Sequence, residues 1–288
     1  MIAWAFDREA LGPPPPGVEV VDEAGPQVEF AIPRWNDAEK LKAMPALRVV
    51  QTISAGVDSI VDQVPDGVTL CSASGARDHA MAEWVMAALL ADVKEARACA
   101  IQQGRRDWEL IPLRDLAGSR VLVLGFGSIG RALQEMLGPF RCEVVGVARR
   151  ARDGVRGIDE LPELLGEADA VVNLLPLTEQ TRGSFGAREL HAMREGALYV
   201  NAGRGATTDT DALVAALHTE RIRAVLDVVE PEPLPADHPL WTAPNVMISP
   251  HSAGDTPGAD RAAWALAAQQ LRRYAAGEPL ENVVTYGY

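Results

Sequence analysis

Short apolar runs alternate with helix-length segments along almost the whole chain. The runs are rich in Val and Ile and lie at residues 2–6, 28–32, 49–54, 68–74, 121–124, 144–148, 169–175, 197–202, 224–229 and 246–250. Strands that are apolar throughout, each followed by a helical segment, are typical of parallel sheets covered by helices on both faces. The alternation therefore predicts an α/β fold.

A long helical segment, from about residue 78 to residue 103, separates the first four apolar runs from the other six. Because this segment divides the runs, we expect two sheets rather than one. The expected architecture is two Rossmann-like, doubly wound domains with parallel sheets. The helical segment would bridge the domains, line a subunit contact or lie buried in the core.

A further helix is predicted near the end of the chain. Thr256 is its expected N-cap, Pro257 occupies its first turn and Gly277 stops it. This helix comes too late to complete the second sheet, so we expect it to pack on the first domain. The predicted organisation is a discontinuous first domain, residues 1–77 plus 257–288, and a second domain, residues 78–256.

The composition argues against several classes of partner and site. The chain has 288 residues, with 27 basic and 40 acidic side chains and a net charge of −13. Such a surface repels nucleic acid and anionic lipid, so we predict neither partner. No secretion signal or uninterrupted apolar span is visible, and we expect a cytoplasmic location. The three cysteines lie far apart and no Cys/His cluster is present, so neither a disulfide framework nor a metal site is predicted.

The stretch VLVLGFGSIGRALQEML, residues 121–137, contains a G-x-G-x-x-G motif. The motif follows an apolar run and opens a helical pattern. In this setting Gly125 permits a tight turn, Gly127 lets the backbone approach a pyrophosphate, and Gly130 allows helix and strand to pack closely. The helix N-terminus offers unpaired N–H groups to phosphate. We therefore predict a dinucleotide site in the second domain, formed by Gly125, Phe126, Gly127, Ser128, Ile129 and Gly130.

The next apolar run, VVGVA at residues 144–148, leads directly into Arg149, Arg150 and Arg152. About 20 residues after the glycines, such a strand usually ends in an Asp or Glu that binds the ribose of NAD. Arg149 holds that place here, and a guanidinium group favours the extra phosphate of NADP. We predict NADP(H) as the preferred cofactor, held by Arg149 and then Arg150, with NAD(H) as the alternative. A structural alternative stays open, in which these arginines are simply solvated at the end of the strand.

Three polar residues follow later apolar runs, at the strand ends where open α/β sheets bind ligands. They are Arg204 in VNAGRG, Glu232 in LDVVEPEPLP and His251 in ISPHSAG. Taken singly, each has a structural alternative: a surface arginine, a loop carboxylate and a hydrogen-bonded structural histidine. Their joint order after the glycine motif favours a catalytic site.

The chain resembles the D-2-hydroxyacid dehydrogenase family, and within it the glyoxylate/hydroxypyruvate reductase-like members. The matching stretches are GFGSIG, SAGVDSI (54–60), MAEWVMAALL (81–90), NLLPLTEQTRG (173–183), VNAGRG (200–205), LDVVEPEPLPADHPLW (226–241) and SPHSAG (249–254). This resemblance implies NAD(P)H-dependent reduction of small 2-oxo acids to D-2-hydroxy acids. It also implies that Arg204, Glu232 and His251 are catalytic and that the first domain binds the substrate.

The chemistry of a 2-oxo acid suits these residue types. Arg204 can fork onto carboxylate and carbonyl oxygens, which lysine cannot do with the same geometry. His251 is a suitable proton donor because imidazole titrates near neutrality, and a neighbouring carboxylate favours its charged form. By the resemblance, backbone N–H groups around Ala55 and Gly56 complete the substrate site, in a cleft between the domains.

The resemblance assigns four further residues to the cofactor: Leu175 and Pro176 to a wall beside it, Thr181 to a phosphate-side contact and Asp227 to the nicotinamide amide. We also expect a homodimer formed through the dinucleotide domain. Trp35 and Trp108 would lie near the substrate or, as the favoured expectation, pack in the core or at an interface.

Two alternative functions stay open. The same fold serves as a catalytically weak, cofactor-sensing binding protein, as in corepressors that resemble these dehydrogenases. Retention of Arg204, Glu232 and His251 argues for catalysis instead. Formate oxidation is disfavoured because, by the resemblance, that chemistry uses a glutamine where this chain has Glu232.

Overall fold

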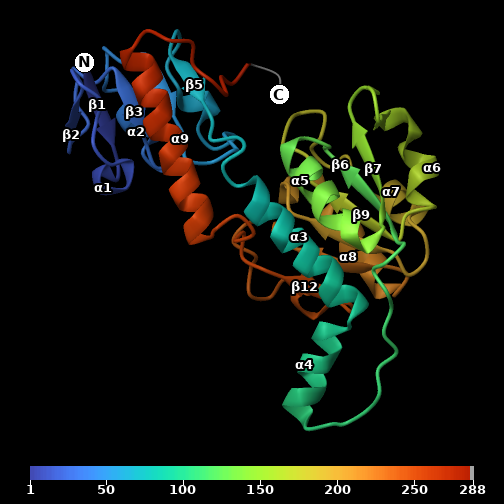
Figure 1. The fold of residues 1–288 in the computed structure, drawn as a ribbon. Helices are drawn as coiled ribbons and strands as arrows, with labels where there is room; N and C mark the ends of the chain where they lie inside the picture. Colours follow the sequence, from blue (N-terminus) through green and yellow to red (C-terminus); the bar gives the residue numbers. More distant parts are fainter. Residues whose placement is uncertain (286–288) are drawn as a thin grey trace. The chain divides into compact units, whose positions relative to one another are not determined.

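The computed structural model describes residues 1–285 and divides into two compact units (Figure 1). The first unit comprises Met1–Asp78 and the chain from Asp255 onward, and the second comprises His79–Gly254. The divisions expected from the sequence fall after residue 77 and before residue 257. Each unit contains one parallel sheet with helices on both faces, so the predicted α/β fold of two doubly wound units is confirmed.

The first unit has a five-stranded sheet in the order β2-β1-β3-β4-β5. Residues on one face of β1, Ala3 and Ala5, pack with α1 and α9, while Trp4 on the other face packs with α2. This alternation is the period of two expected of a strand covered on both faces. The elements of the unit are β1 (Ile2–Ala5), α1 (Arg8–Leu11), β2 (Glu19–Val21), β3 (Phe30–Ile32), α2 (Ala38–Leu41), β4 (Val49–Gln51), the 3-10 helix η1 (Val61–Gln63), β5 (Thr69–Cys71) and α9 (Pro257–Ala275).

Helix α9 belongs to the first unit although it follows every strand of the second. Its side chains Trp264, Ala267 and Leu271 are buried in the same cluster as Phe30 and Ile32 of β3. The Thr256 hydroxyl accepts a hydrogen bond from the Ala259 N–H at 3.1 Å and caps the helix. The first unit is therefore discontinuous in sequence.

The second unit has a seven-stranded sheet in the order β12-β11-β10-β9-β6-β7-β8. The strand order reverses between β6 and β9, which is where open α/β sheets bind their ligands. Its elements are α3 (Asp78–Val93), α4 (Ala96–Arg105), β6 (Arg120–Leu124), α5 (Ser128–Leu137), η2 (Gly138–Phe140), β7 (Glu143–Ala148), β8 (Val155–Gly157), η3 (Ile158–Glu160), α6 (Leu161–Leu165), β9 (Ala170–Asn173), α7 (Ala187–Ala192), β10 (Leu198–Asn201), η4 (Gly205–Thr207), α8 (Thr210–His218), β11 (Arg223–Leu226), η5 (Pro239–Thr242) and β12 (Val246–Ile248).

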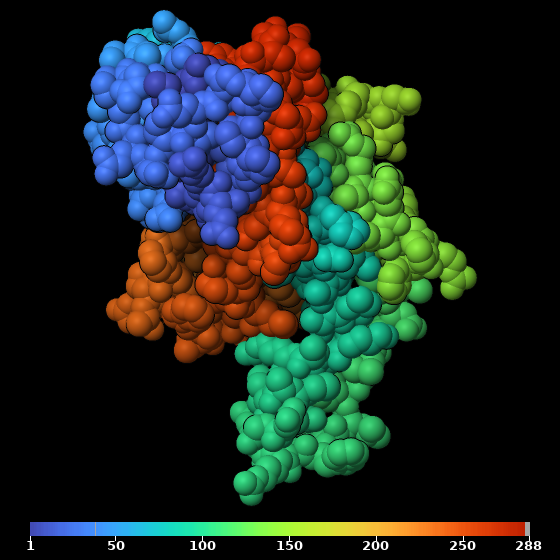
Figure 2. All heavy atoms as spheres, turned by 60° about the vertical axis from the view of Figure 1, so that its left-hand side comes forward, coloured from blue at the N-terminus to red at the C-terminus, as the bar shows by residue number. Residues whose placement is uncertain are grey.

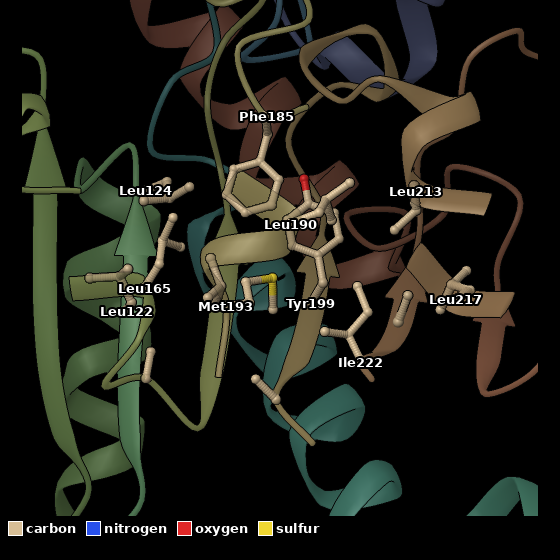
Figure 3. Close-up of a cluster of buried hydrophobic side chains, with 14 of the residues drawn as sticks. Leu122, Leu124, Leu165, Phe185, Leu190, Met193, Tyr199, Leu213, Leu217 and Ile222 are labelled. Atoms are coloured by element: carbon tan, nitrogen blue, oxygen red, sulfur yellow. The ribbon is translucent and has the colours of Figure 1, made fainter. Parts of the chain in front are cut away.

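The core of the second unit lies on both faces of this sheet. Leu122 and Leu124 of β6 face α6, α7 and α8, in the cluster that Figure 3 shows. Phe185 and Tyr199 stack there with ring centroids 4.6 Å apart. The alternate residues of β6, Val121 among them, face α3 and α5. Two covered faces hold the strand ends in fixed positions, which is what a site built on those ends requires.

The prediction of one continuous helix over residues 78–103 is wrong. The structure has two helices, α3 and α4, separated at Glu95, whose φ of 50° is left-handed. Arg114 explains the break, because its Nη2 donates to the Asp92 carbonyl at 3.0 Å and to Glu95 Oε1 at 3.1 Å. It thereby binds a carbonyl at the end of α3. The strands β2 and β8, of three residues each, were not expected from the sequence.

Helix α4 and the segment after it project from the rest of the second unit (Figure 2). Trp108 is 98% exposed and Leu110 is 100% exposed in this segment. In the first unit, Trp35 is 76% exposed. Core packing is therefore wrong for both tryptophans. No helix within residues 1–285 combines the length and apolar character that a membrane crossing requires.

Candidate functional site

The glycine loop joins β6 to α5 at the point where the strand order reverses. Gly125 has a φ of 80°, and a Cβ there would lie 2.8 Å from the carbonyl oxygen of Leu174, which follows β9. Gly127, by contrast, has only its own loop within 4 Å of such an atom. The first turn of α5 has no side-chain cap. The loop thus presents open space and helix N–H groups together, which fits a pyrophosphate.

The Phe126 ring holds this loop against the sheet. A Cβ at Gly146 in β7 would lie 2.4 Å from the ring, and one at Gly130 in α5 would lie 3.0 Å from it. The Gly125 N–H also donates to the Val147 carbonyl at 3.0 Å. Gly130 and Gly146 therefore leave the space that the Phe126 ring occupies. Gly146 was not singled out in the sequence because it lies inside a strand and outside the glycine motif.

The arginine cluster lies beside the glycine loop, since β6 and β7 are paired and both end there. Arg149 and Arg150 are exposed, and neither forms an ion pair with another residue in the described part of the chain. Arg152 Nη2 donates to the Phe126 carbonyl at 2.6 Å and links the cluster to the loop. In a chain of net charge −13, unpaired guanidinium groups at this place fit an anionic ligand.

Arg204 follows β10 in a turn between two crowded glycines. A Cβ at Gly203 would lie 2.7 Å from the Leu175 carbonyl oxygen, and one at Gly205 would lie 1.9 Å from that of Val229. The Arg204 carbonyl accepts hydrogen bonds from Asn201 Nδ2 at 3.2 Å and from Thr207 Oγ1 at 2.6 Å. The backbone that carries Arg204 is therefore fixed from both sides.

A buried polar network lies beneath the Arg204 turn. Asn173 Nδ2 donates to Tyr199 Oη at 2.8 Å and to Thr207 Oγ1 at 2.9 Å, and Tyr199 Oη lies 2.6 Å from Thr208 Oγ1. Burial raises the pKa of Tyr199 to about 12, so its hydroxyl keeps its proton and remains a donor. Sequence reasoning missed these residues, because each is an ordinary residue in its own stretch and no motif links them.

Glu232 and His251 are in direct contact. Glu232 Oε2 lies 2.8 Å from His251 Nδ1, and its other oxygen accepts the Val229 N–H at 3.0 Å. Because an ionised carboxylate only accepts, Nδ1 carries the proton, and Nε2 is left for a ligand. His251 has a φ of 53°, a conformation that few non-glycine residues adopt.

Asp227 holds the segment that carries His251. It is 3% exposed, and its carboxylate accepts from Ser249 Oγ at 2.6 Å, the Ser252 N–H at 2.8 Å and the Ala253 N–H at 3.0 Å. The Asp227 carbonyl also accepts the His251 N–H at 2.8 Å. These bonds account for the left-handed backbone of His251. The carboxylate expected to bind the nicotinamide amide is thus engaged within the chain.

The remaining expected residues lie on the same edge or in the other unit. Leu175 is half-buried and Pro176 is exposed, directly after β9. Thr181 Oγ1 donates to the Pro176 carbonyl at 2.6 Å and closes the turn that follows β9. Ala55 and Gly56 follow β4 in the first unit, where Ser54 Oγ donates to the Gly56 carbonyl at 2.8 Å.

A family profile described as D-isomer specific 2-hydroxyacid dehydrogenase, NAD binding domain, matches residues 86–253. The chain belongs to this family. The resemblance drawn from the sequence motifs is confirmed, and the second unit of this 2-hydroxyacid dehydrogenase family member corresponds to the NAD-binding domain.

Several similar proteins carry a reductase or dehydrogenase name. The chain is 37% identical over 235 residues to glyoxylate/hydroxypyruvate reductase B of Escherichia fergusonii, covering 76% of this chain and 72% of that protein. It is 32% identical over 265 residues to glyoxylate reductase of Aeropyrum pernix, covering 86% and 79%. The structure of an NADPH-dependent glyoxylate/hydroxypyruvate reductase from Sinorhizobium meliloti, in complex with NADP and sulfate, matches with a TM-score of 0.87 at 28% identity, covering 98% of each chain.

A second structure is that of a D-isomer specific 2-hydroxyacid dehydrogenase from Xanthobacter autotrophicus Py2 in complex with NADPH and MES. It matches with a TM-score of 0.86 at 32% identity, covering 99% of this chain and 98% of that one. Both structures therefore share the fold over almost the full length of this chain.

Proposed function

We propose that this family member is an NADPH-preferring reductase of small 2-oxo acids, of the glyoxylate and hydroxypyruvate type, that forms D-2-hydroxy acids. The observation that carries the proposal is the contact between Glu232 and His251, on the same sheet edge as the glycine loop and the Arg149 cluster. The names of the similar reductases support the substrate class.

Each residue has a proposed role. His251 delivers a proton from Nε2 to the carbonyl oxygen, while Glu232 holds Nδ1 and stabilises the charged imidazole. Arg204 binds the carboxylate and carbonyl oxygens of the substrate. Backbone N–H groups at Ala55 and Gly56 complete the carboxylate site. A reduced nicotinamide, when bound, supplies the hydride to C2.

The cofactor is proposed to bind along the glycine loop. The N–H groups of Ser128, Ile129 and the turn before them hold the pyrophosphate, and Leu175 and Pro176 form a wall beside it. Arg149 and Arg150 bind the 2′-phosphate of NADP(H). Asp227 contributes by holding the segment that carries His251, and Thr181 by closing the turn after β9.

Oxidation of NADPH and NADH with a panel of 2-oxo acids tests this function. We expect the catalytic efficiency with NADPH to exceed that with NADH by roughly tenfold to a few hundredfold, from two solvent-discounted guanidinium contacts. Replacing Arg149 and Arg150 by glutamine should remove most of that ratio, whereas Arg156→Gln, on an exposed arginine paired with Glu160, should leave it unchanged. A preference for NADH would refute the cofactor assignment. No turnover with any acid would favour the cofactor-sensing binding role.

We also propose a homodimer formed through the second unit. The apolar residues Trp108 and Leu110, fully exposed on a projecting segment, support this role because apolar side chains so exposed usually mark an interface. Replacing both by glutamate is expected to give a monomer by light scattering. Trp35→Glu, at an exposed tryptophan of the first unit, is the matched control. A wild-type protein that runs as a monomer would contradict the proposal.

A further inference from the structure

Arg77 lies where the chain passes between the two units. The outgoing passage falls between Asp78 and His79, and the return passage falls between Gly254 and Asp255. Arg77 precedes the first of these by one residue. Its side chain is 16% exposed, which is unusual for an arginine in a connecting segment.

The guanidinium group of Arg77 binds the returning chain. Its Nη1 lies 3.1 Å from Asp255 Oδ1, at the first residue after the passage, and its Nη2 lies 2.6 Å from Asp260 Oδ1 in the first turn of α9. One side chain thus joins the two passages within the first unit. Two carboxylates on one half-buried guanidinium fix its position better than a single exposed ion pair would.

The same side chain reaches the loop after β4. Arg77 Nε donates to the Ile53 carbonyl at 3.5 Å, directly before Ser54, Ala55 and Gly56. The loop is closed by its own hydrogen bonds: Thr52 Oγ1 donates to the Ser54 carbonyl at 2.7 Å, and the Ala73 N–H donates to the same carbonyl at 2.9 Å.

This loop has the features of an anion-binding turn. The N–H groups of Ser54 and Gly56 donate no hydrogen bond to any residue in the described range, 1–285. Backbone N–H groups left open in a turn, as at these two positions, are suited to a carboxylate. The hydrogen bonds that hold the loop in this conformation therefore also determine its affinity for an anion.

We propose that Arg77 is a positioning residue, which ties the substrate-carboxylate loop at residues 54–56 to the two points where the chain passes between the units. The identity of the loop's ligand rests on the proposed function, but the coupling of Arg77 to the loop does not. Loss of Arg77 frees the Ile53 carbonyl and both aspartates together, so the loop loses its attachment to α9 and to the passage.

Hydrogen exchange and kinetics on Arg77→Gln test this role. The Thr52 and Ala73 amides, which bond Cys71 and Ser54, are expected to exchange at least tenfold faster, and KM for glyoxylate to rise at least tenfold. The dissociation constant for NADPH should change by less than about twofold, because the glycine loop belongs to the other unit. Asp260→Asn, which leaves the guanidinium in place, should give a smaller change of the same sign.

Arg273→Gln is the matched control. Arg273 also joins a carboxylate, Glu281 at 3.1 Å, to a backbone carbonyl, Pro279 at 2.7 Å, but at the far end of α9. It should lower the melting temperature without altering exchange at Thr52 and Ala73 or KM. Unchanged exchange at both amides in Arg77→Gln would overturn the proposal. A wild-type protein without 2-oxo acid turnover would instead refute the proposed function, while the exchange result still decides the role of Arg77.

Discussion

Replacing His251 by alanine should lower the turnover of 2-oxo acids by ~10²-fold or more, the usual contribution of a positioned acid. The imidazole contacts Glu232 through Nδ1 at 2.8 Å, and Nε2 is the proposed proton donor. The affinity for NADPH should stay within about twofold of the wild-type value, because His251 does not belong to the glycine loop. Single-turnover kinetics and a fluorescence titration with NADPH measure the two quantities.

A matched control is His79→Ala, which removes a histidine that also pairs with a glutamate, Glu83 at 3.4 Å, but on the exposed face of α3. Its turnover should equal that of the wild type. The turnover of Glu232→Gln should lie between those of His251→Ala and His79→Ala, because the amide keeps one contact with Nδ1 and loses the charge. Unchanged turnover in His251→Ala would remove this residue from the mechanism.

Replacing Gly205 by alanine should lower the free energy of unfolding by about 3 kcal/mol, near the upper range for overpacking. The added Cβ would lie 1.9 Å from the Val229 carbonyl oxygen and 2.1 Å from its carbon, so backbone rather than a flexible side chain must move. Either Arg204 or the Val229 segment, whose N–H holds Glu232, is displaced. Urea denaturation measures the loss of stability, and turnover should fall with it.

Gly104→Ala provides the comparison for this substitution. Gly104 lies in α4, and nothing is within 4 Å of a Cβ built there. Alanine should therefore raise stability, by up to about 1 kcal/mol, since glycine is the poorer helix former. Equal stability of the two variants would show that the Gly205 contact relaxes at no cost.

The parts of the site that the sequence predicted are those whose chemistry depends on local spacing. The glycines of the loop and the arginines that follow the next strand stand at fixed distances along the chain, so the motif alone indicates their position. Glu232 and His251 lie farther apart in sequence, yet both follow neighbouring strands of one parallel sheet. Parallel pairing brings the ends of such strands together, which is why their contact was foreseeable.

The supporting residues depend on contacts that spacing does not encode. Asn173, Tyr199 and Thr208 meet beneath Arg204 from three different segments, and each is an ordinary residue in its own stretch. The break between helices α3 and α4 at Glu95 depends on Arg114, nearly 20 residues later in the chain. The role of Asp227 also required coordinates, because its carboxylate accepts the N–H groups of Ser252 and Ala253, which follow His251 in the chain.

The late position of α9 in the chain sets an order of events during synthesis. All strands of the seven-stranded sheet lie between Arg120 and Ile248, so that sheet is complete before α9 leaves the ribosome. Residues 79–254 take roughly 10 to 35 s to translate at typical rates. Throughout that interval Phe30 and Ile32 have no Trp264 or Leu271 to cover them. The nascent chain therefore exposes an apolar face of its first sheet to water, and chaperones that recognise such surfaces are expected to bind there.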